Sequence, residues 1–277
     1  MSYSSITNAM TVDVEDYFQV AAFDNFISPD SWDSISHRVQ NNTFKILDLF
    51  AQHQVKATFF TLGWVAERYP DIVKRVVNEG HELASHGYAH KKATSQTRQE
   101  FREDIIKAKQ ILEDISGKEI KGYRAPSYSV SKKNLWVHEE LYDTGHQYSS
   151  SVYPVKHDLY GIPDAPRFTY QCKNGLIEIP ISTLKIGSKN LPAGGGGFFR
   201  LYPYALTRWV INHINKTDQQ ATSFYFHPWE IDPEQPRQEQ ASLKSKFRHY
   251  LNLHKTEARL KQLLTDFNWD RMDKVFL

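Results

Sequence analysis

Short apolar, β-branched runs alternate with segments of helical periodicity along almost the whole chain. The strand-like runs occupy 8–14, 55–63, 81–87, 121–130, 147–152, 176–183 and 221–231. The helical patterns between and after them cover 38–53, 66–80, 95–116, 132–144, 201–216 and a charged tail from 244 onward. This alternation predicts an α/β fold with a parallel sheet, either open or closed as a barrel.

Two local features refine this pattern. The clearest helix covers 95–116, where apolar residues recur at steps of four and three until Gly117 stops the pattern. The run GGGGFF at 194–199 predicts flexible backbone, which would be either a loop over a site or a plain linker. The chain of 277 residues is long enough for one large α/β domain or two modest ones.

Composition excludes several functional classes. The formal net charge of +2 gives no electrostatic case for binding nucleic acid. Cys172 is the only cysteine, so an internal disulfide and a cysteine-based metal site are both excluded. No apolar run reaches 18 residues, and the first ten residues do not resemble a signal peptide, so we expect a cytoplasmic protein without a membrane span. A trimmed leader would leave the same sequence.

Residues 81–90, HELASHGYAH, contain three of the 12 histidines of the chain. Neutral imidazoles are good metal ligands, and the spacing of His86 and His90 can place two rings at one ion. His81 lies at the other end of the same predicted strand, so we expect it to pack or to form hydrogen bonds. On spacing alone, a polar surface loop explains these histidines as well as a metal site does.

Polar residues that could perform chemistry follow the ends of several predicted strands. They are Asp13, Glu15 and Asp16 after the first strand, His86 and His90 after a later one, Arg124 after the next, and His227 after the last. Active sites of α/β barrels lie at the carboxyl ends of the strands, where several loops converge. This arrangement predicts a single site, with a bound metal, at that end of the sheet.

Four short motifs, in this order, resemble those of the NodB-type polysaccharide deacetylases, carbohydrate esterase family 4. They are TVDVED at 11–16, HGYAH at 86–90, RAPSY at 124–128 and FYFH at 224–227. The stretches GGGGFFRLYPY and HPWEID resemble the branch associated with bacterial exopolysaccharide gene clusters. The resemblance implies a distorted (β/α) barrel, with seven strands expected. It also implies one domain over 1–277, in which 190–277 is a family-specific C-terminal extension that completes the barrel.

The resemblance implies a metal-dependent hydrolase that removes N-acetyl groups from a polysaccharide or oligosaccharide, with zinc as the expected metal. His86 and His90 would be ligands. Strand alternation places Asp13 and Glu15 on the same face, which favours Glu15 as the carboxylate ligand and leaves Asp16 as the alternative.

The resemblance also implies the roles of the remaining site residues. Asp13 would be the general base, His227 the general acid, and Arg124 would orient Asp13 and favour its charged form. Tyr128 and Trp229 are candidates for contacts with the sugar.

The sequence departs from the family pattern at three places. The adjacent aspartates of the family are replaced by the spaced acids of 13–16, Ser127 occupies the expected position of a tyrosine, and Ser149 stands where an aspartate is expected. These departures leave the support of Arg124 open. The departures at 14–16 and 127 also keep the alternative of a metallo-hydrolase of cyclic amides or imides on the same scaffold. A third hypothesis is a sugar-binding protein that has lost the chemistry, although the presence of all the proposed catalytic and ligand residues argues against it.

Overall fold

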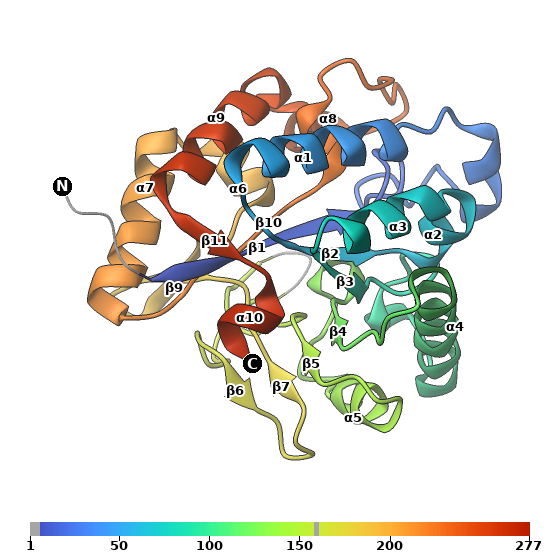
Figure 1. Cartoon of the computed structure of the whole chain (residues 1–277), viewed down its shortest axis with the longest axis horizontal. Coiled ribbons are helices and arrows are strands. Elements are labelled where there is room, and N and C mark those ends of the chain that lie inside the picture. The colour runs from blue at the N-terminus through green and yellow to red at the C-terminus, as the bar shows by residue number, and fades with distance from the viewer. Residues whose placement is uncertain (1–5, 158–160) are drawn as a thin grey trace.

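A computed structural model describes residues 6–157 and 161–277, and its centre is a curved sheet of parallel strands (Figure 1). Seven strands run parallel in the order β10, β1, β2, β3, β4, β5 and β7. Their bounds are Thr7–Val14 (β1), Thr58–Thr61 (β2), Glu82–Ser85 (β3), Gly122–Tyr123 (β4), Tyr148–Ser149 (β5), Ile177–Glu178 (β7) and Ser223–Phe226 (β10). The predicted α/β fold with a curled, barrel-like sheet is confirmed.

Two further strands extend this sheet, and the segments on either side of a separate hairpin form hydrogen bonds to it. The added strands are β6, Tyr170–Gln171, antiparallel to β7, and β11, Asn268–Asp270, which pairs with β1. The hairpin comprises β8, Thr183–Ile186, and β9, Lys189–Pro192. Its flanking segments donate from Ile181 N to Val152 O at 3.1 Å and accept at Gly194 O from Tyr225 N at 2.7 Å. The path from β7 to β10 is therefore bridged by these flanking segments.

Helices surround the outside of the strands, as Figure 1 shows for α9, α1, α3, α4 and α5. Their bounds are Val39–His53 (α1), Gly63–Arg68 (α2), Pro70–Asn78 (α3), Arg98–Ser116 (α4), Trp136–Asp143 (α5), Gly196–Leu201 (α6), Tyr204–His213 (α7), Leu243–Tyr250 (α8), Leu253–Asp266 (α9) and Met272–Phe276 (α10). Short 3₁₀ turns are η1 (Pro29–Ser34), η2 (Ala93–Ser95), η3 (Pro126–Tyr128) and η5 (Pro228–Ile231), and η4 (Ile214–Asp218) is a π turn. No helix in the described ranges combines the length and apolar character needed to cross a bilayer.

Side-chain alternation along β1 sorts the residues that reach the site from those that build the core. Met10, Val12 and Val14 join the large apolar cluster beneath the helices. Ala9 belongs instead to a small interior cluster, to which α10 contributes Met272. Since side chains alternate between faces, Asp13 shares the interior face of Ala9.

The predicted helix over 66–80 is wrong as a single element. The chain forms α2 and α3 instead, and they meet at Tyr69 and Pro70. Proline lacks the backbone N–H that a continuous helix would need and starts α3 at its first position, where that donor is not required. The helix over 95–116 is confirmed in type, and it begins with a capping box between Thr97 and Glu100 and ends at Gly117 in the left-handed conformation.

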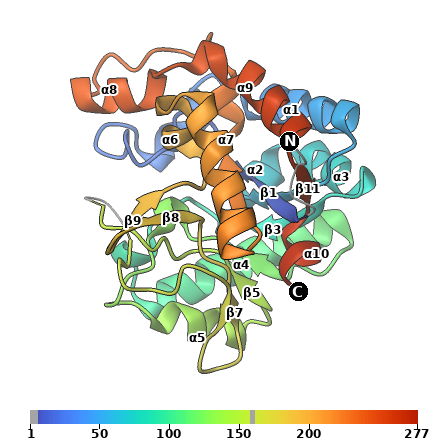
Figure 2. The same cartoon turned by 90° about the vertical axis from the view of Figure 1, so that its left-hand side faces the viewer.

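The glycine run 194–197 is neither a flexible linker nor a loose loop. Gly195 has φ +119°, and a Cβ at this position would lie 2.0 Å from the carbonyl oxygen of Tyr225. The backbone therefore packs directly against β10, which only glycine permits. The adjoining hairpin packs on α7 and η4, where Leu184 contacts Val210 of α7 and Ile214 of η4 (Figure 2).

Candidate metal and catalytic site

A cavity of about 250 Å³ opens at the carboxyl ends of β1, β3 and β10. Its lining includes seven of the side chains that the sequence singled out, namely Asp13, Glu15, His86, His90, Tyr128, His227 and Trp229. Arg124 lies behind this lining, fully buried and paired with Asp13. The structure thus brings together residues from segments more than 200 positions apart in the sequence.

Glu15, His86 and His90 form a group whose potential ligand atoms all lie within 4.8 Å of one another. His90 Nε2 is 2.7 Å from Glu15 Oε2, and the rings of the two histidines are 5.4 Å apart. Two imidazoles and one carboxylate are a ligand set suited to Zn²⁺ and to related divalent metals. The residues present therefore fit a bound metal, with ligand positions left for water and substrate.

His86 is held in the form that a metal requires. Its Nδ1 lies 2.7 Å from the carbonyl oxygen of Arg124, so Nδ1 carries the proton and Nε2 keeps its lone pair. Burial, followed by the neighbouring His90, lowers the pKa of His86 to about 3. A neutral imidazole is thus favoured at this position.

Glu15 is buried against the cavity wall. Burial alone would raise its pKa, but His90 and His227 together hold the pKa below its usual range. Trp229 Nε1 donates to Glu15 Oε1 at 3.3 Å. These contacts favour a charged, oriented carboxylate, which is what a metal ligand needs.

Asp16, the alternative ligand, lies outside this group. Its carboxylate accepts hydrogen bonds from the backbone N–H groups of Arg38, Val39 and Tyr17 at 2.7 Å, 2.9 Å and 2.9 Å. Two of these donors are the residue that precedes α1 and its first residue, so Asp16 satisfies the N-terminus of that helix. The structure therefore places Asp16 in a supporting role.

Asp13 is fixed by Arg124 on one side and faces the cavity on the other. Arg124 Nη1 lies 2.6 Å from Asp13 Oδ1. The second oxygen, Oδ2, lies 3.9 Å from His227 Nε2. One oxygen is thus committed to the ion pair, and the other is directed toward the space between the histidines.

Arg124 is supported without the aspartate that the family pattern has near position 149. Its Nη2 donates to Ser150 Oγ at 3.0 Å, its Nε donates to Ser150 O at 3.2 Å, and its Nη1 donates to Thr11 Oγ1 at 2.7 Å. The guanidinium also lies 4.0 Å from the ring centre of Phe60. Hydroxyl and carbonyl groups therefore replace the missing carboxylate, and Asp13 is the only acidic partner of Arg124 within the described ranges.

His227 lies on the opposite wall and is oriented by a buried relay that the sequence analysis missed. Its Nδ1 is 2.6 Å from Glu230 Oε1, and the other oxygen of Glu230 accepts from Arg200 Nε at 2.6 Å. Burial would lower the pKa of His227, but Glu15, Glu230 and Asp13 raise it to about 9. The spacing of His227 and Glu230 in HPWEID was the available signal, because the three-residue separation suits a single turn.

The two aromatic candidates occupy different positions at the cavity. Trp229 stacks between His227 and His249, with ring centres 5.1 Å and 4.2 Å away, so it positions the histidine as well as lining the cavity. Tyr128 and Ser127 both line the cavity, and both have left-handed backbone, with φ of 50° and 55°. Through this strained turn Tyr128 lines the cavity, although it lies one sequence position after the tyrosine of the family pattern.

His81 is buried at the opposite end of β3 from the metal group. Its Nδ1 accepts a hydrogen bond from Ala57 N at 3.1 Å, and its ring contacts Phe50 and Phe59. Burial, followed by Lys56, lowers its pKa to about 3, so it is neutral. It is a core residue at the base of the sheet.

Comparison with known families agrees with this geometry. Residues 26–147 match the family model described as polysaccharide deacetylase. Over these residues the chain therefore resembles the polysaccharide deacetylases. Residues 150–277 match a second model, described as a domain of unknown function, DUF3473. The deacetylase model covers His86, His90 and Arg124, whereas His227 and its relay lie in the second segment.

The curated relatives match only part of this chain. A peptidoglycan-N-acetylglucosamine deacetylase of Bacillus cereus is 43% identical over 99 residues, which are 35% of this chain and 36% of the relative. A peptidoglycan deacetylase of Helicobacter pylori is 31% identical over 108 residues, which are 39% of this chain and 36% of the relative. The match thus spans little more than a third of either relative.

Solved structures support the fold over the full length. A Mycobacterium smegmatis protein described as a polysaccharide deacetylase matches with a TM-score of 0.63 and 16% identity, over 99% of this chain and 90% of that one. An allantoinase matches with a TM-score of 0.60 and 14% identity, over 98% of this chain and 89% of that one. At these identities, the likeness concerns the fold alone.

Proposed function

We propose that this protein is a metal-dependent hydrolase that removes N-acetyl groups from amino sugars of a polysaccharide. One observation carries the proposal: the candidate metal group lies between a carboxylate tied to Arg124 and a histidine tied to Glu230, in one cavity. Hydrolysis of an amide needs an activated water, a site for the oxyanion and a proton for the leaving amine. The relatives named above are deacetylases of N-acetylated glycans, which supports the same chemistry.

Glu15, His86 and His90 would hold the metal, and we propose zinc because two imidazoles and a carboxylate suit it. A metal held there would lower the pKa of a bound water molecule and polarise the acetyl carbonyl. The carbonyl of Arg124 accepts from His86 and the indole of Trp229 donates to Glu15, and these two contacts would hold the ligand side chains in place.

Asp13 takes the proton of the attacking water as general base. Arg124 occupies one of its oxygens, so the reaction uses the other, which faces the cavity. The buried ion pair fixes the carboxylate in a single orientation, which lowers the cost of positioning it in the transition state. Arg124 is therefore a positioning residue that acts through Asp13.

His227 delivers a proton to the leaving nitrogen as general acid. Glu230 binds Nδ1, so Nε2 is the nitrogen that faces the substrate. Proton transfer from Nε2 releases the amine as the tetrahedral intermediate collapses, and the products are acetate and a free amino sugar. Asp13 and His227 thus work from opposite walls, one as proton acceptor and one as proton donor.

We further propose that the substrate belongs to exopolysaccharide biosynthesis. Two observations support this: GGGGFFRLYPY and HPWEID resemble the branch associated with bacterial exopolysaccharide gene clusters, and both stretches lie at the catalytic site. The first supplies Arg200 and the second supplies His227 and Glu230, so both contribute to the relay behind the proposed acid.

Acetate release and metal content test the proposed function. The metal-loaded protein should release acetate from N-acetylated oligosaccharides and leave a cyclic imide panel intact. His86→Ala and His90→Ala should each lose bound metal and activity while keeping the melting temperature near that of the wild type. Hydrolysis of the imides without acetate release would favour the cyclic amide alternative. Wild-type protein that binds no metal would favour the sugar-binding alternative.

A further inference from the structure

The two histidines of the proposed metal site are held in different ways. His86 is fixed through its side chain, because Nδ1 donates to the carbonyl oxygen of Arg124 at 2.7 Å. His90 contacts Glu15 through Nε2, and within the described residues no protein group forms a hydrogen bond with its other nitrogen, Nδ1. The orientation of the His90 ring therefore depends on the backbone that carries it.

The backbone at His90 has a conformation that needs support. Its φ is +53°, in the left-handed region that residues other than glycine seldom adopt. Such a conformation persists only where the surrounding structure holds it. The contacts of the loop 86–90 therefore bear directly on where the second imidazole lies.

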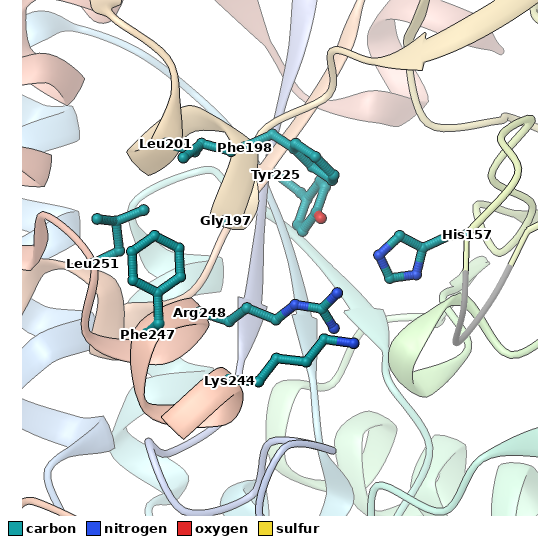
Figure 3. Close-up of a pocket in the computed structure, with 9 residues that line it drawn as sticks. All are labelled: His157, Gly197, Phe198, Leu201, Tyr225, Lys244, Phe247, Arg248 and Leu251. Atoms are coloured by element: carbon teal, nitrogen blue, oxygen red, sulfur yellow. The ribbon is translucent and has the colours of Figure 1, made fainter. Parts of the chain in front are cut away.

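The support for this loop comes from the N-terminal half of the chain. Figure 3 shows a cavity of about 380 Å³ beside α6 and α8, with Tyr225 in its wall. The described lining of that cavity includes no residue of the loop 86–90 and none of α4. The loop is bound instead by α2 and α4, which both lie within the segment that matches the deacetylase model.

Helix α2 holds the carbonyl groups of the loop. Gly63 N donates to Gly87 O at 2.9 Å, and Trp64 N donates to Tyr88 O at 3.1 Å. The hydroxyl of Tyr88 also donates to Glu67 Oε2 at 2.7 Å. The first N–H groups of a helix have no acceptor inside it, so these bonds satisfy the helix and the loop together.

Asp104 of α4 holds the N–H groups of the loop. Its Oδ2 accepts from Tyr88 N at 2.8 Å, and its carboxylate also accepts from Ala89 N. A Cβ on Gly87 would lie 2.7 Å from this oxygen, so glycine at that position lets the carboxylate reach the loop. The ammonium of Lys107, one turn along α4, lies 3.3 Å from the ring centre of Tyr88. The residues between the two histidines are thus enclosed by both helices.

We propose that Asp104 is a positioning residue of the metal site, which acts through the loop backbone to set the ring of His90 against Glu15 and His86. The inference rests on the proposed function for the presence of a metal. It adds to that site a side chain that neither belongs to the metal group nor lines the catalytic cavity. Without this carboxylate, two N–H groups of the loop lose their acceptor, and the left-handed backbone at His90 loses the support beside it.

Metal affinity and ligand geometry test the proposal. Asp104→Ala should weaken zinc binding roughly tenfold in competition with a chelator, the lower end of the cost of removing support behind metal ligands. The visible absorption spectrum of the variant loaded with Co²⁺ should also change in band position and intensity, because it reports the geometry of the ligands. A loss of stability alone would leave that spectrum unchanged.

Glu113→Ala is the matched control. Glu113 lies on the same helix and its carboxylate also accepts a backbone bond, from Ile120 N at 2.9 Å, but it is not in the metal group. This variant should keep the wild-type zinc affinity and Co²⁺ spectrum, even if its melting temperature falls as far as that of Asp104→Ala.

A second substitution keeps the test valid if Asp104→Ala does not fold. Asp104→Asn preserves the size of the side chain and one oxygen acceptor, so we expect a folded protein with a smaller loss of zinc affinity, roughly threefold. Wild-type affinity and spectrum in a folded Asp104 variant, or the same losses in Glu113→Ala, would overturn the proposal.

Hydrogen exchange and acetate release separate this inference from the proposed function. In the metal-free protein, Asp104→Ala should accelerate amide exchange at Tyr88 and Ala89 about tenfold, and Glu113→Ala should not. A wild-type protein that binds zinc but releases no acetate loses the proposed function, and a loss of affinity in the Asp104 variants would still establish the positioning role. Acetate release by the wild type, with unchanged zinc affinity in the Asp104 variants, keeps the function and removes that role.

Discussion

Glu230 determines which nitrogen of His227 faces the catalytic cavity. Its Oε1 lies 2.6 Å from Nδ1, while Nε2 lies 3.6 Å from Glu15 and 3.9 Å from Asp13. The opposite oxygen of Glu230 is held by Arg200 from α6. The proposed acid is therefore oriented by a carboxylate that is itself fixed by a buried arginine.

Replacing Glu230 with glutamine should lower turnover by about one to two orders of magnitude, the usual cost of losing such an orienting partner. Glu230 raises the pKa of His227, so its removal lowers that pKa and moves the basic limb of the pH–rate profile to lower pH. Metal content should be unchanged, because Glu230 is not in the metal group. A uniform loss of rate with an unshifted profile would assign Glu230 to packing alone.

Mutations should distinguish the role of Glu15 as a metal ligand from the structural role of Asp16. Glu15→Gln should weaken metal binding by about ten- to a hundredfold, measured by competition with a chelator, with little change in melting temperature. Asp16→Asn should keep the metal but lose about 1–2 kcal/mol of unfolding free energy, because the amide nitrogen of asparagine cannot accept one of the backbone N–H bonds that the carboxylate accepts. If the Asp16 variant loses metal while the Glu15 variant keeps it, the ligand assignment is wrong.

The position of the candidate site could be predicted from the sequence because it follows strand geometry. Parallel strands end at one edge of the sheet, so Asp13 and His86 had to lie near each other once both strands were recognised. The choice of Glu15 over Asp16 came from alternation, and the geometry agrees with it. These inferences needed only local patterns and the order of the strands.

The relay and the glycine run could not be predicted in the same way. Arg200 reaches Glu230 only because α6 packs against β10, and nothing local to Arg200 indicates that contact. The glycines that bring α6 there have the composition of flexible backbone, which the sequence analysis interprets as either a loop over a site or a plain linker. Their real constraint, the carbonyl of Tyr225, is 30 positions away along the chain.

Gly195→Ala should be strongly destabilising. The new Cβ would lie 2.0 Å from Tyr225 O at a φ of +119°, so strand β10 or α6 must shift. We expect a loss of more than about 3 kcal/mol in urea unfolding, in the upper range for single substitutions. Gly187→Ala is the matched control, because its φ of +58° is also positive but no atom lies within 4 Å. It should cost only about 1 kcal/mol, and equal losses at both positions would contradict the packing argument.

The buried pair of His138 and Glu178 should make stability depend on alkaline pH. Burial would lower the pKa of His138, but Cys172 and Glu178 raise it from the ordinary value of 6.5 to about 10. The stabilisation is therefore complete below pH 6.5 and is lost as the pH rises through about 10. The unfolding free energy should therefore fall more between pH 6 and pH 10 for the wild type than for His138→Gln. Parallel curves would show that the pair does not titrate as stated.

His227→Ala tests the proposed acid most directly. The variant should retain its metal, because His227 is outside the metal group, and should lose about two to four orders of magnitude in turnover, the usual value of a positioned acid. The deficit should be smaller for substrates with a better leaving group, which depend less on protonation. His249→Gln is a useful control, since His249 stacks on the other face of Trp229 without lining the catalytic cavity. Equal, modest deficits for good and poor leaving groups would make His227 a packing residue and place the general acid elsewhere.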